Sequence, residues 1–235
     1  RRPPRSTLFP TRRSSDLRDG ELGSGSRQTG SSGQQHVLQT LLIISIMINV
    51  LMWNIRGISR RPNLRRLIRL VKSHDITFVA ISEPKLSFSR IDYIRMRLAF
   101  DSAVGNQTGD LWIFFNTPFG CSIVGNSNQH ISLSVQHPWL PSPLVFSFVH
   151  AKCSVEERRE LWSNLLRDKP RASPWCIGGD FNVIIAPHEK RGGRPFAMTE
   201  GLELLSFMEE AEVFDAGFSG PSFIWSNNRK GRARI

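Results

Sequence analysis

Polar residues that could do chemistry recur directly after apolar runs of the sequence. Asn54 and Glu83 each close such a run, His150 closes a third, and Asp180 and Asn182 follow a Gly-Gly pair. Catalytic and binding side chains are commonly placed at the ends of strands, so we expect these positions to carry the function. Taken singly, each residue also fits a solvated loop or a turn; the ordered set points to a site.

The chemistry that these residue types favour is hydrolysis of a phosphodiester. The Glu83 carboxylate is a hard oxygen ligand for Mg²⁺ or Mn²⁺, and waters and phosphate would fill the remaining positions. Such an ion polarises the phosphoryl oxygen and stabilises the leaving group. Asp180 could orient or deprotonate the attacking water. Asn54 and Asn182 could position metal or phosphate without adding charge, and Gly179 would allow close backbone approach in front of Asp180.

The elements that must position these residues alternate between strand-like and helix-like blocks from Met47 onward. Apolar and β-branched runs predict strands at Ile48–Asn54, Ile76–Ser82, Leu111–Phe115, Cys121–Val124, Ile131–Val135, Leu144–His150 and Trp175–Gly178. Strands in hairpin-like succession, interrupted by helices, indicate an α/β sandwich in which two sheets pack face to face with helices outside.

Four helices are predicted between and after these strands. Pro62 suits a first helical turn, and an apolar face follows at Leu64, Leu67, Ile68 and Val71. A shorter helix is expected around Ile91, Ile94 and Leu98. Ser154 and Glu157 form a capping-box pattern before a helix through Leu161, Leu165 and Leu166. The last helix is expected to open at Thr199 and to bury Leu202, Leu205 and Met208.

Composition sets broad limits on the kind of protein. The 235 residues are 40% hydrophobic and 22% charged, which indicates one globular domain with an additional arm. The formal net charge of +11 makes a polyanion such as DNA a plausible partner, and a solvated basic surface is equally compatible with it. Three scattered cysteines, Cys121, Cys153 and Cys176, exclude a disulfide scaffold and a zinc-finger pattern, and a reducing compartment fits them best.

The N-terminal region differs from the rest of the sequence. Residues 1–36 are rich in Arg, Gly, Ser and Gln without apolar periodicity, so we expect a disordered basic arm. Arg1–Leu17 resembles translated sequencing-adapter read-through, so we interpret the arm as an artefact; the alternative is an arm that touches phosphates. Residues 37–47 are an apolar lead-in of uncertain status. Val37–Trp53 approaches the length of a membrane span, but its second half is better explained as a buried strand, and we expect no membrane insertion.

Several motifs of the chain resemble the endonuclease/exonuclease/phosphatase superfamily. They are Trp53-Asn54-Ile55-Arg56-Gly57, Ser82-Glu83-Pro84-Lys85 and Gly178-Gly179-Asp180-Phe181-Asn182. The likeness is closest to the endonuclease domain of plant LINE-type, non-LTR retrotransposon proteins, to which three further segments are similar: Val149–Cys153, Glu189–Pro195 and Phe223–Asn227. The resemblance runs from about Asn49 to the last residue, and the domain is expected to span residues 48–235.

The resemblance implies a four-layered α/β sandwich that cleaves DNA with Mg²⁺ or Mn²⁺. By position, Glu83 and Asn54 would bind the metal, and Asp180, Asn182 and His150 would be catalytic. The substrate would be contacted by Arg56, Asn182, Trp225 and Asn227. The resemblance also implies residence in the nucleus. No obligate protein partner is evident from the sequence.

Three departures from the family pattern bear on activity. His150 stands where the family usually has Tyr, and Ile224 stands where it often has Thr. The chain ends at Ile235, before the family's later Asp and its terminal Ser-Asp-His-like motif, so we expect a domain incomplete at its C-terminus and inactive as this piece. Two other functions stay open: a phosphoesterase of the same superfamily acting on a small phosphate ester, and a non-catalytic basic module that binds nucleic acid.

Overall fold

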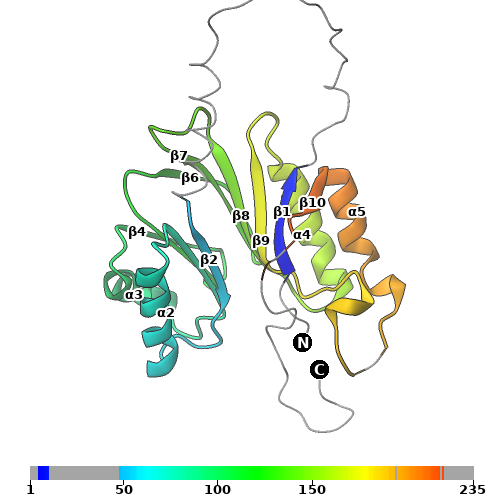
Figure 1. Ribbon diagram of the computed structural model, residues 1–235, viewed down its shortest axis with the longest axis horizontal. Helices are drawn as coiled ribbons and strands as arrows, with labels where there is room; N and C mark the ends of the chain where they lie inside the picture. Colours follow the sequence, from blue (N-terminus) through cyan, green and yellow to red (C-terminus); the bar gives the residue numbers. More distant parts are fainter. Residues whose placement is uncertain (1–4, 11–47, 194, 218, 220–235) are drawn as a thin grey trace, which may run out of the picture.

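The computed structural model describes residues 5–10, 48–193, 195–217 and 219. Its elements form four layers, with two sheets packed face to face and two helices outside each sheet (Figure 1). This confirms the predicted four-layered α/β sandwich.

The four-stranded sheet has the order β2, β3, β5, β4, with β2 (Val50–Asn54) parallel to β3 (Phe78–Ser82). The strand β5 (Leu111–Phe115) is antiparallel to β3 and to β4 (Ser102–Gly105). Two helices, α2 (Arg61–Ser73) and α3 (Ile91–Leu98), pack on its outer face, and a short 3-10 helix, Phe88–Arg90, precedes α3. In α2 the apolar residues Leu64, Leu67, Ile68 and Val71 face the sheet, as their spacing predicts.

The six-stranded sheet has the order β10, β1, β9, β8, β7, β6. Its strands are β10 (Val213–Asp215), β1 (Arg5–Pro10), β9 (Trp175–Asp180), β8 (Leu144–His150), β7 (His130–Gln136) and β6 (Gly120–Asn126). The pair β8 and β9 is parallel, and the other neighbours are antiparallel. Its outer face is covered by α4 (Val155–Asp168) and α5 (Leu202–Ala211), and short 3-10 helices lie at Pro187–Glu189 and Met198–Glu200.

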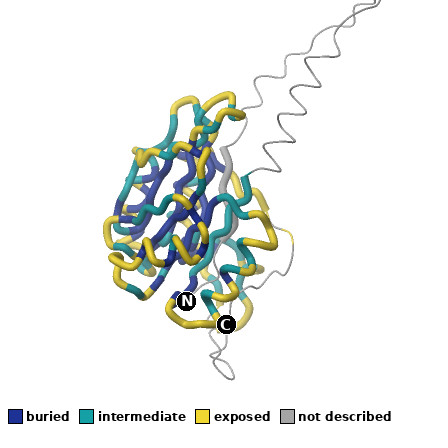
Figure 2. The backbone as a smooth tube through the Cα atoms, turned by 90° about the vertical axis from the view of Figure 1, so that its left-hand side faces the viewer, coloured by how far each residue is buried: buried dark blue, intermediate teal, exposed yellow. Residues whose placement is uncertain are grey.

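An aromatic cluster holds the two sheets together. The ring of Phe78 on β3 lies 5.8 Å from that of Phe115, 5.2 Å from that of Phe119 and 5.7 Å from that of Phe146 on the opposite sheet, centroid to centroid. Full burial of a Phe side chain contributes about 1.5–3 kcal/mol. These buried strands form the centre of the molecule, and the connecting loops are exposed (Figure 2). The relative position of the two sheets, and so of their strand ends, is therefore firmly fixed.

Most predicted elements are confirmed, but α5 corrects the sequence reading. The helix begins at Leu202 instead of Thr199, after a 3-10 helix and Gly201. It buries Leu204, Phe207 and Ala211. Of the three residues predicted to be buried, Met208 packs partly buried against the same core, whereas Leu202 and Leu205 are exposed. Both sets of apolar residues have helical spacing, so the sequence alone could not choose the buried face. The short strands β4 and β10 were not predicted.

The strand β1 departs from the expected disorder of residues 1–36. Its backbone pairs antiparallel with β9 on one side and with β10 on the other, in the register Leu8↔Ile177 and Leu8↔Asp215. The arm is therefore not unstructured throughout. A composition-based prediction cannot anticipate this, because the edge of β9 offers backbone donors and acceptors that an extended segment of almost any sequence can satisfy.

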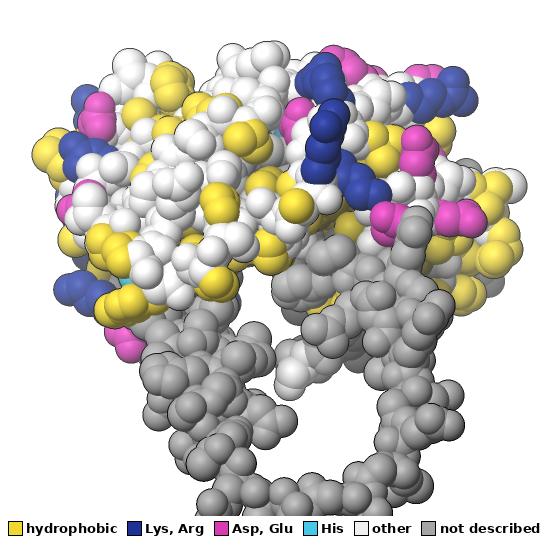
Figure 3. Space-filling view, turned by 90° about the horizontal axis from the view of Figure 1, so that it is seen from above, with side chains coloured by type: hydrophobic (Ala, Val, Ile, Leu, Met, Phe, Trp, Pro, Cys, Tyr) yellow, Lys and Arg dark blue, Asp and Glu magenta, His cyan; other side chains and the backbone are white. Residues whose placement is uncertain are grey.

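The surface at the far end of the strands from Asn54 and Asp180 carries both signs of charge. Seen from above, Lys and Arg side chains lie close to Asp and Glu side chains, with apolar side chains between them (Figure 3). That face therefore has no field of a single sign. Among the described helices, none combines the length and apolar character that crossing a membrane requires.

Candidate active site

Asn54 joins the strand ends of the two sheets. It is the last residue of β2, and its Nδ2 donates hydrogen bonds to Glu83 Oε1 at 2.9 Å and to Asp180 Oδ2 at 3.0 Å. One amide group thus holds two carboxylates, one from each sheet. Its other polar atom, Oδ1, is buried and has no hydrogen-bond partner. Few buried polar atoms of a folded protein lack a hydrogen-bond partner, and an oxygen left in this way beside two carboxylates is available to a ligand.

Glu83 is held by backbone contacts on two sides. Its N–H donates to the carbonyl of Asp110 at 3.0 Å, and its carbonyl accepts from the N–H of Gly57 at 2.9 Å. Its φ of 51° lies in the left-handed region, as do those of Arg56 and Lys85. Such a conformation costs a non-glycine residue of the order of 1 kcal/mol and persists where neighbours fix it, commonly at functional sites. The loop after β2, which carries Arg56, therefore lies against Glu83.

His150 ends β8 and lies in register with Asp180 on β9. Its Nε2 is 3.9 Å from Glu83 Oε1, which is beyond hydrogen-bond distance. Burial lowers the pKa of His150 from its usual value, because desolvation disfavours the imidazolium, and the negative charges of Asp180, Glu83 and Asp110 oppose this shift. The lowered pKa favours the neutral imidazole at neutral pH, in which one ring nitrogen donates a hydrogen bond and the other accepts one.

Asn182 fixes Asp180 and the neighbouring loop. Its backbone N–H donates to Asp180 Oδ1 at 3.1 Å, and its Nδ2 donates to the carbonyl of Ala151 at 2.6 Å. The N–H of Ala151 in turn donates to the carbonyl of Asp180 at 2.8 Å. A Cβ on Gly179 would collide with the backbone of Val149, so the close approach expected at this glycine is present. The backbone N–H of Asn182 thus orients the Asp180 carboxylate, and the Asn182 side chain connects the segments that follow β8 and β9.

Arg158 on α4 is a buried residue that the sequence reading missed. Its Nη1 donates to the carbonyls of Lys152 at 3.2 Å, Cys153 at 2.7 Å and Asn182 at 3.3 Å, and its guanidinium pairs with Glu203 on α5. One side chain therefore ties the loops that follow β8 and β9 to both helices. The signal was present in the sequence, because Arg158 shares helical spacing with the buried Leu161, Trp162 and Leu165.

Two more charged residues flank the carboxylates. Lys85 Nζ lies 3.5 Å from Glu83 Oε2. Asp110 lies near enough to His150 for its charge to raise the pKa of that imidazole. Lys85 belongs to the Ser82–Lys85 motif, and Asp110 lies between Gly109 and the predicted strand that begins at Leu111. Both are next to a predicted strand end, and this position could have identified them as candidate site residues.

The donors present suit a hard divalent cation. Glu83, Asp180 and the unpartnered Oδ1 of Asn54 offer oxygen atoms only. Within the described residues, no three His, Cys, Asp or Glu side chains cluster tightly enough to enclose a metal. Mg²⁺ commonly keeps several waters and takes only one or two protein carboxylates together with substrate phosphate, so an open site of this kind fits it.

The structure brings together five of the predicted site residues, namely Asn54, Glu83, His150, Asp180 and Asn182. Arg56 lies in the adjoining loop, next to the Gly57 that bonds to Glu83. The predicted substrate contacts Trp225 and Asn227 lie outside the described residues.

Comparison with known proteins gives a result at the level of the fold. No family model and no curated protein matches the sequence. Among solved structures, the chain is similar to TDP2 from Caenorhabditis elegans, at 14% identity over 66% of this chain and a TM-score of 0.42. It is also similar to the human Nocturnin catalytic domain, at 17% identity over 57% of this chain and a TM-score of 0.43. The chain spans 56% and 64% of the lengths of these two proteins.

The order of the layers and one further solved structure define the class of fold. A more extensive match is the endonuclease domain of TRAS1, a telomere-specific non-LTR retrotransposon. The identity is 11%, the match covers 80% of this chain and 80% of that domain, and the TM-score is 0.57. At this identity the likeness establishes a shared fold.

Proposed function

We propose that the chain carries the metal-dependent phosphodiesterase site of a DNA endonuclease of the non-LTR retrotransposon kind. The observation that supports this most directly is the Asn54 amide, which holds Glu83 and Asp180 together while its Oδ1 is left without a partner. The similarity to the TRAS1 endonuclease domain over 80% of both chains supports the DNA substrate.

In this proposal Glu83 is the principal ligand of Mg²⁺ or Mn²⁺, and Asn54 Oδ1 lies next to it as a second oxygen donor. The bound cation supplies the charge that polarises a phosphoryl oxygen and stabilises the leaving oxygen. Asp180 would orient a water and accept its proton, and the hydrogen bonds that its carboxylate accepts from Asn54 and from the N–H of Asn182 support this role.

His150 takes a neutral role in this arrangement. Because its lowered pKa favours the uncharged imidazole, it can donate one hydrogen bond to a phosphate oxygen without an ion pair. Asn182 acts on the phosphate chiefly through the position of Asp180, since its Nδ2 already donates to Ala151. Arg56, Trp225 and Asn227 are proposed substrate contacts. Residence in the nucleus is proposed with the retrotransposon function.

The first test is Mn²⁺ binding, because it does not depend on turnover. Titration of the 235-residue chain with Mn²⁺, followed by electron paramagnetic resonance, should show a site that Glu83→Gln removes. Glu160→Gln changes an exposed glutamate on α4 and is the matched control, which should bind as the parent chain does. Binding that is unchanged in Glu83→Gln would contradict the proposal.

The second test is nicking of supercoiled plasmid with Mg²⁺ or with chelator. Metal-dependent nicking that disappears in Glu83→Gln supports the endonuclease function and contradicts the expectation that this piece is inactive. Cleavage of soluble phosphate esters without plasmid nicking would favour a small-molecule phosphoesterase. Salt-sensitive DNA binding without any Mn²⁺ site would favour a non-catalytic basic module.

A further inference from the structure

The helix α2 presents a row of basic side chains to solvent. Arg61, Arg65, Arg69 and Lys72 are exposed and are spaced by four, four and three residues, which places them along one side of the helix. The opposite side of α2 packs on the four-stranded sheet. The row is therefore separate from the surface that stabilises the fold.

These charges have no acidic counterpart on the described surface. Within the described residues, none of the four forms an ion pair with Asp or Glu, and the first turn of α2 contains no acidic residue. Like charges four residues apart destabilise a helix by about 0.2–0.5 kcal/mol per pair, and a positive charge at the N-terminus opposes the helix dipole. By contrast, α4 has Glu156 and Glu157 in its first turn and Arg167 in its last. The arrangement on α2 thus costs stability, which indicates another role.

The row begins beside the candidate site. α2 follows β2 through the loop in which Gly57 bonds to Glu83, and it lies in the outer layer next to β2 (Figure 1). From Arg61 to Lys72 the helix rises by roughly 16 Å. One strand of B-form DNA carries a phosphate per about 3.4 Å of axis, so the row could lie along about five phosphates.

We propose that the basic row of α2 binds the phosphate backbone of duplex DNA next to the site that cleaves it. This rests on the proposed function for the identity of the substrate. An anionic membrane is a poorer match, because a membrane-binding helix inserts its apolar side, and the apolar side of α2 is already packed in the fold. A phosphate backbone needs only the exposed charges.

The test is equilibrium binding of a duplex of about 20 base pairs in the presence of chelator, measured by fluorescence anisotropy between about 50 and 200 mM salt. The variant Arg65→Gln/Arg69→Gln removes two charges from the row. The matched control Arg159→Gln/Arg171→Gln removes two exposed charges elsewhere. The row variant should lower the slope of log affinity against log salt by about 2, and the control should leave it unchanged.

Equal slopes in the two double variants would overturn the proposal, and so would binding of anionic phosphatidylserine vesicles that depends on the row while DNA binding does not. The duplex titration is made without metal, so its outcome does not depend on whether the Mn²⁺ titration finds a site at Glu83. The two proposals can therefore fail separately. Circular dichroism and the thermal midpoint of the row variant establish that α2 is intact.

Discussion

Two histidines of the six-stranded sheet, His130 and His150, lie on neighbouring strands and have opposite surroundings. His130 is in register with Val149, the residue before His150. Side chains alternate between the faces of a strand, so His130 points toward the helices α4 and α5, and His150 points to the other side. Each faces a carboxylate, Asp168 for His130 and Glu83 for His150.

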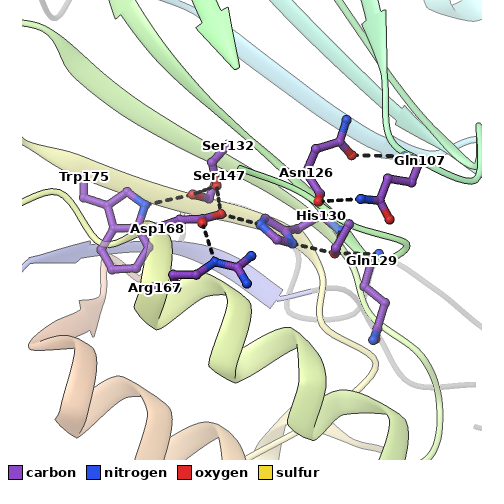
Figure 4. Close-up of polar contacts among 10 residues, drawn as sticks. Gln107, Asn126, Gln129, His130, Ser132, Ser147, Arg167, Asp168 and Trp175 are labelled. Carbon is purple, nitrogen blue, oxygen red and sulfur yellow. Dashed lines mark hydrogen bonds and ion pairs between the residues drawn. The ribbon is translucent and has the colours of Figure 1, made fainter. Parts of the chain in front are cut away.

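The cluster around His130 has its hydrogen bonds satisfied (Figure 4). The Ser127 hydroxyl accepts from the N–H groups of Gln129 and His130, so it donates to His130 Nδ1 at 2.7 Å. The other ring nitrogen then carries the proton and donates to Asp168 Oδ2 at 2.7 Å. These three residue types also make up the catalytic triad of serine hydrolases, but His130 is fully buried here, and no substrate could reach Ser127.

A second chain of hydrogen bonds ends at the same carboxylate, that of Asp168. Trp175 Nε1 donates to Ser147 Oγ at 2.8 Å, the hydroxyls of Ser147 and Ser132 lie 2.7 Å apart, and Ser132 Oγ donates to Asp168 Oδ2 at 3.3 Å. The cluster therefore ties β7, β8 and β9 to the end of α4. The group around His150 instead leaves Asn54 Oδ1 unpaired and the Glu83 side chain 14% exposed. A satisfied polar cluster stabilises a fold, whereas an incomplete one that solvent can reach through a partly exposed side chain is available for a ligand.

The largest expected effect concerns the metal site. Glu83→Gln should lower the affinity for Mn²⁺ by about 1000-fold, about 4 kcal/mol, because the principal charged ligand is lost. The free energy of unfolding should change by less than about 1 kcal/mol, since the side chain is not part of the core. Mn²⁺ titration and urea denaturation measure the two quantities. A large loss of stability with unchanged Mn²⁺ binding would make this cluster structural, like that of His130.

A change in the buried cluster around His130 should instead affect the stability of the fold. Asp168→Ala should lower the free energy of unfolding by about 3 kcal/mol, because it leaves His130 Nε2 and the Ser132 hydroxyl buried without their acceptor. Asp92→Ala is the control, since that carboxylate pairs with Arg95 at the surface and its loss should cost below about 1 kcal/mol. Urea denaturation compares the two. Similar losses for both would show that the buried cluster does not stabilise the fold.

Two glycines of β6 test how firmly the Asp168 carboxylate is held in the buried cluster. A Cβ on Gly125 would collide with the Asp168 carboxylate, which is held by its partners, whereas a Cβ on Gly120 has room beside Gln136. Gly125→Ala should therefore cost about 2 kcal/mol more than Gly120→Ala. Thermal unfolding of the two variants checks this. Equal midpoints would mean that Asp168 moves aside freely.

The smallest effect is a dependence of stability on pH. Burial lowers the pKa of both His130 and His150 in the folded chain, while the unfolded chain keeps the usual value of 6.5. Below pH 6.5 the unfolded state binds more protons, so the free energy of unfolding should fall as the pH drops, by up to about 1.4 kcal/mol per pH unit for each histidine. Urea denaturation from neutral to acidic pH measures it. His130→Asn should make the curve flatter, and an unchanged curve would contradict this assignment.

Local sequence patterns were sufficient to predict most of the elements. The strands β5 and β8 begin and end where their apolar runs do. The Ser154 side chain accepts from the N–H of Glu157, as the capping-box pattern indicates. The candidate site followed from polar residues at strand ends together with the family resemblance. In α5 the same kind of argument was wrong, because two apolar stripes were available and only packing against the sheet selects one.

The sequence by itself determined the class of elements, the basic charge and the residue types of the site, because helix and strand periodicities and turn residues act over a few positions. The tertiary structure decided which polar residues meet. Asn54 and Asp180 are 126 residues apart in the chain, and their contact depends on how the two sheets pack. It also decided that His130 is enclosed and His150 is not. The physical reason is that burial and the completion of hydrogen bonds depend on neighbours that are distant in sequence.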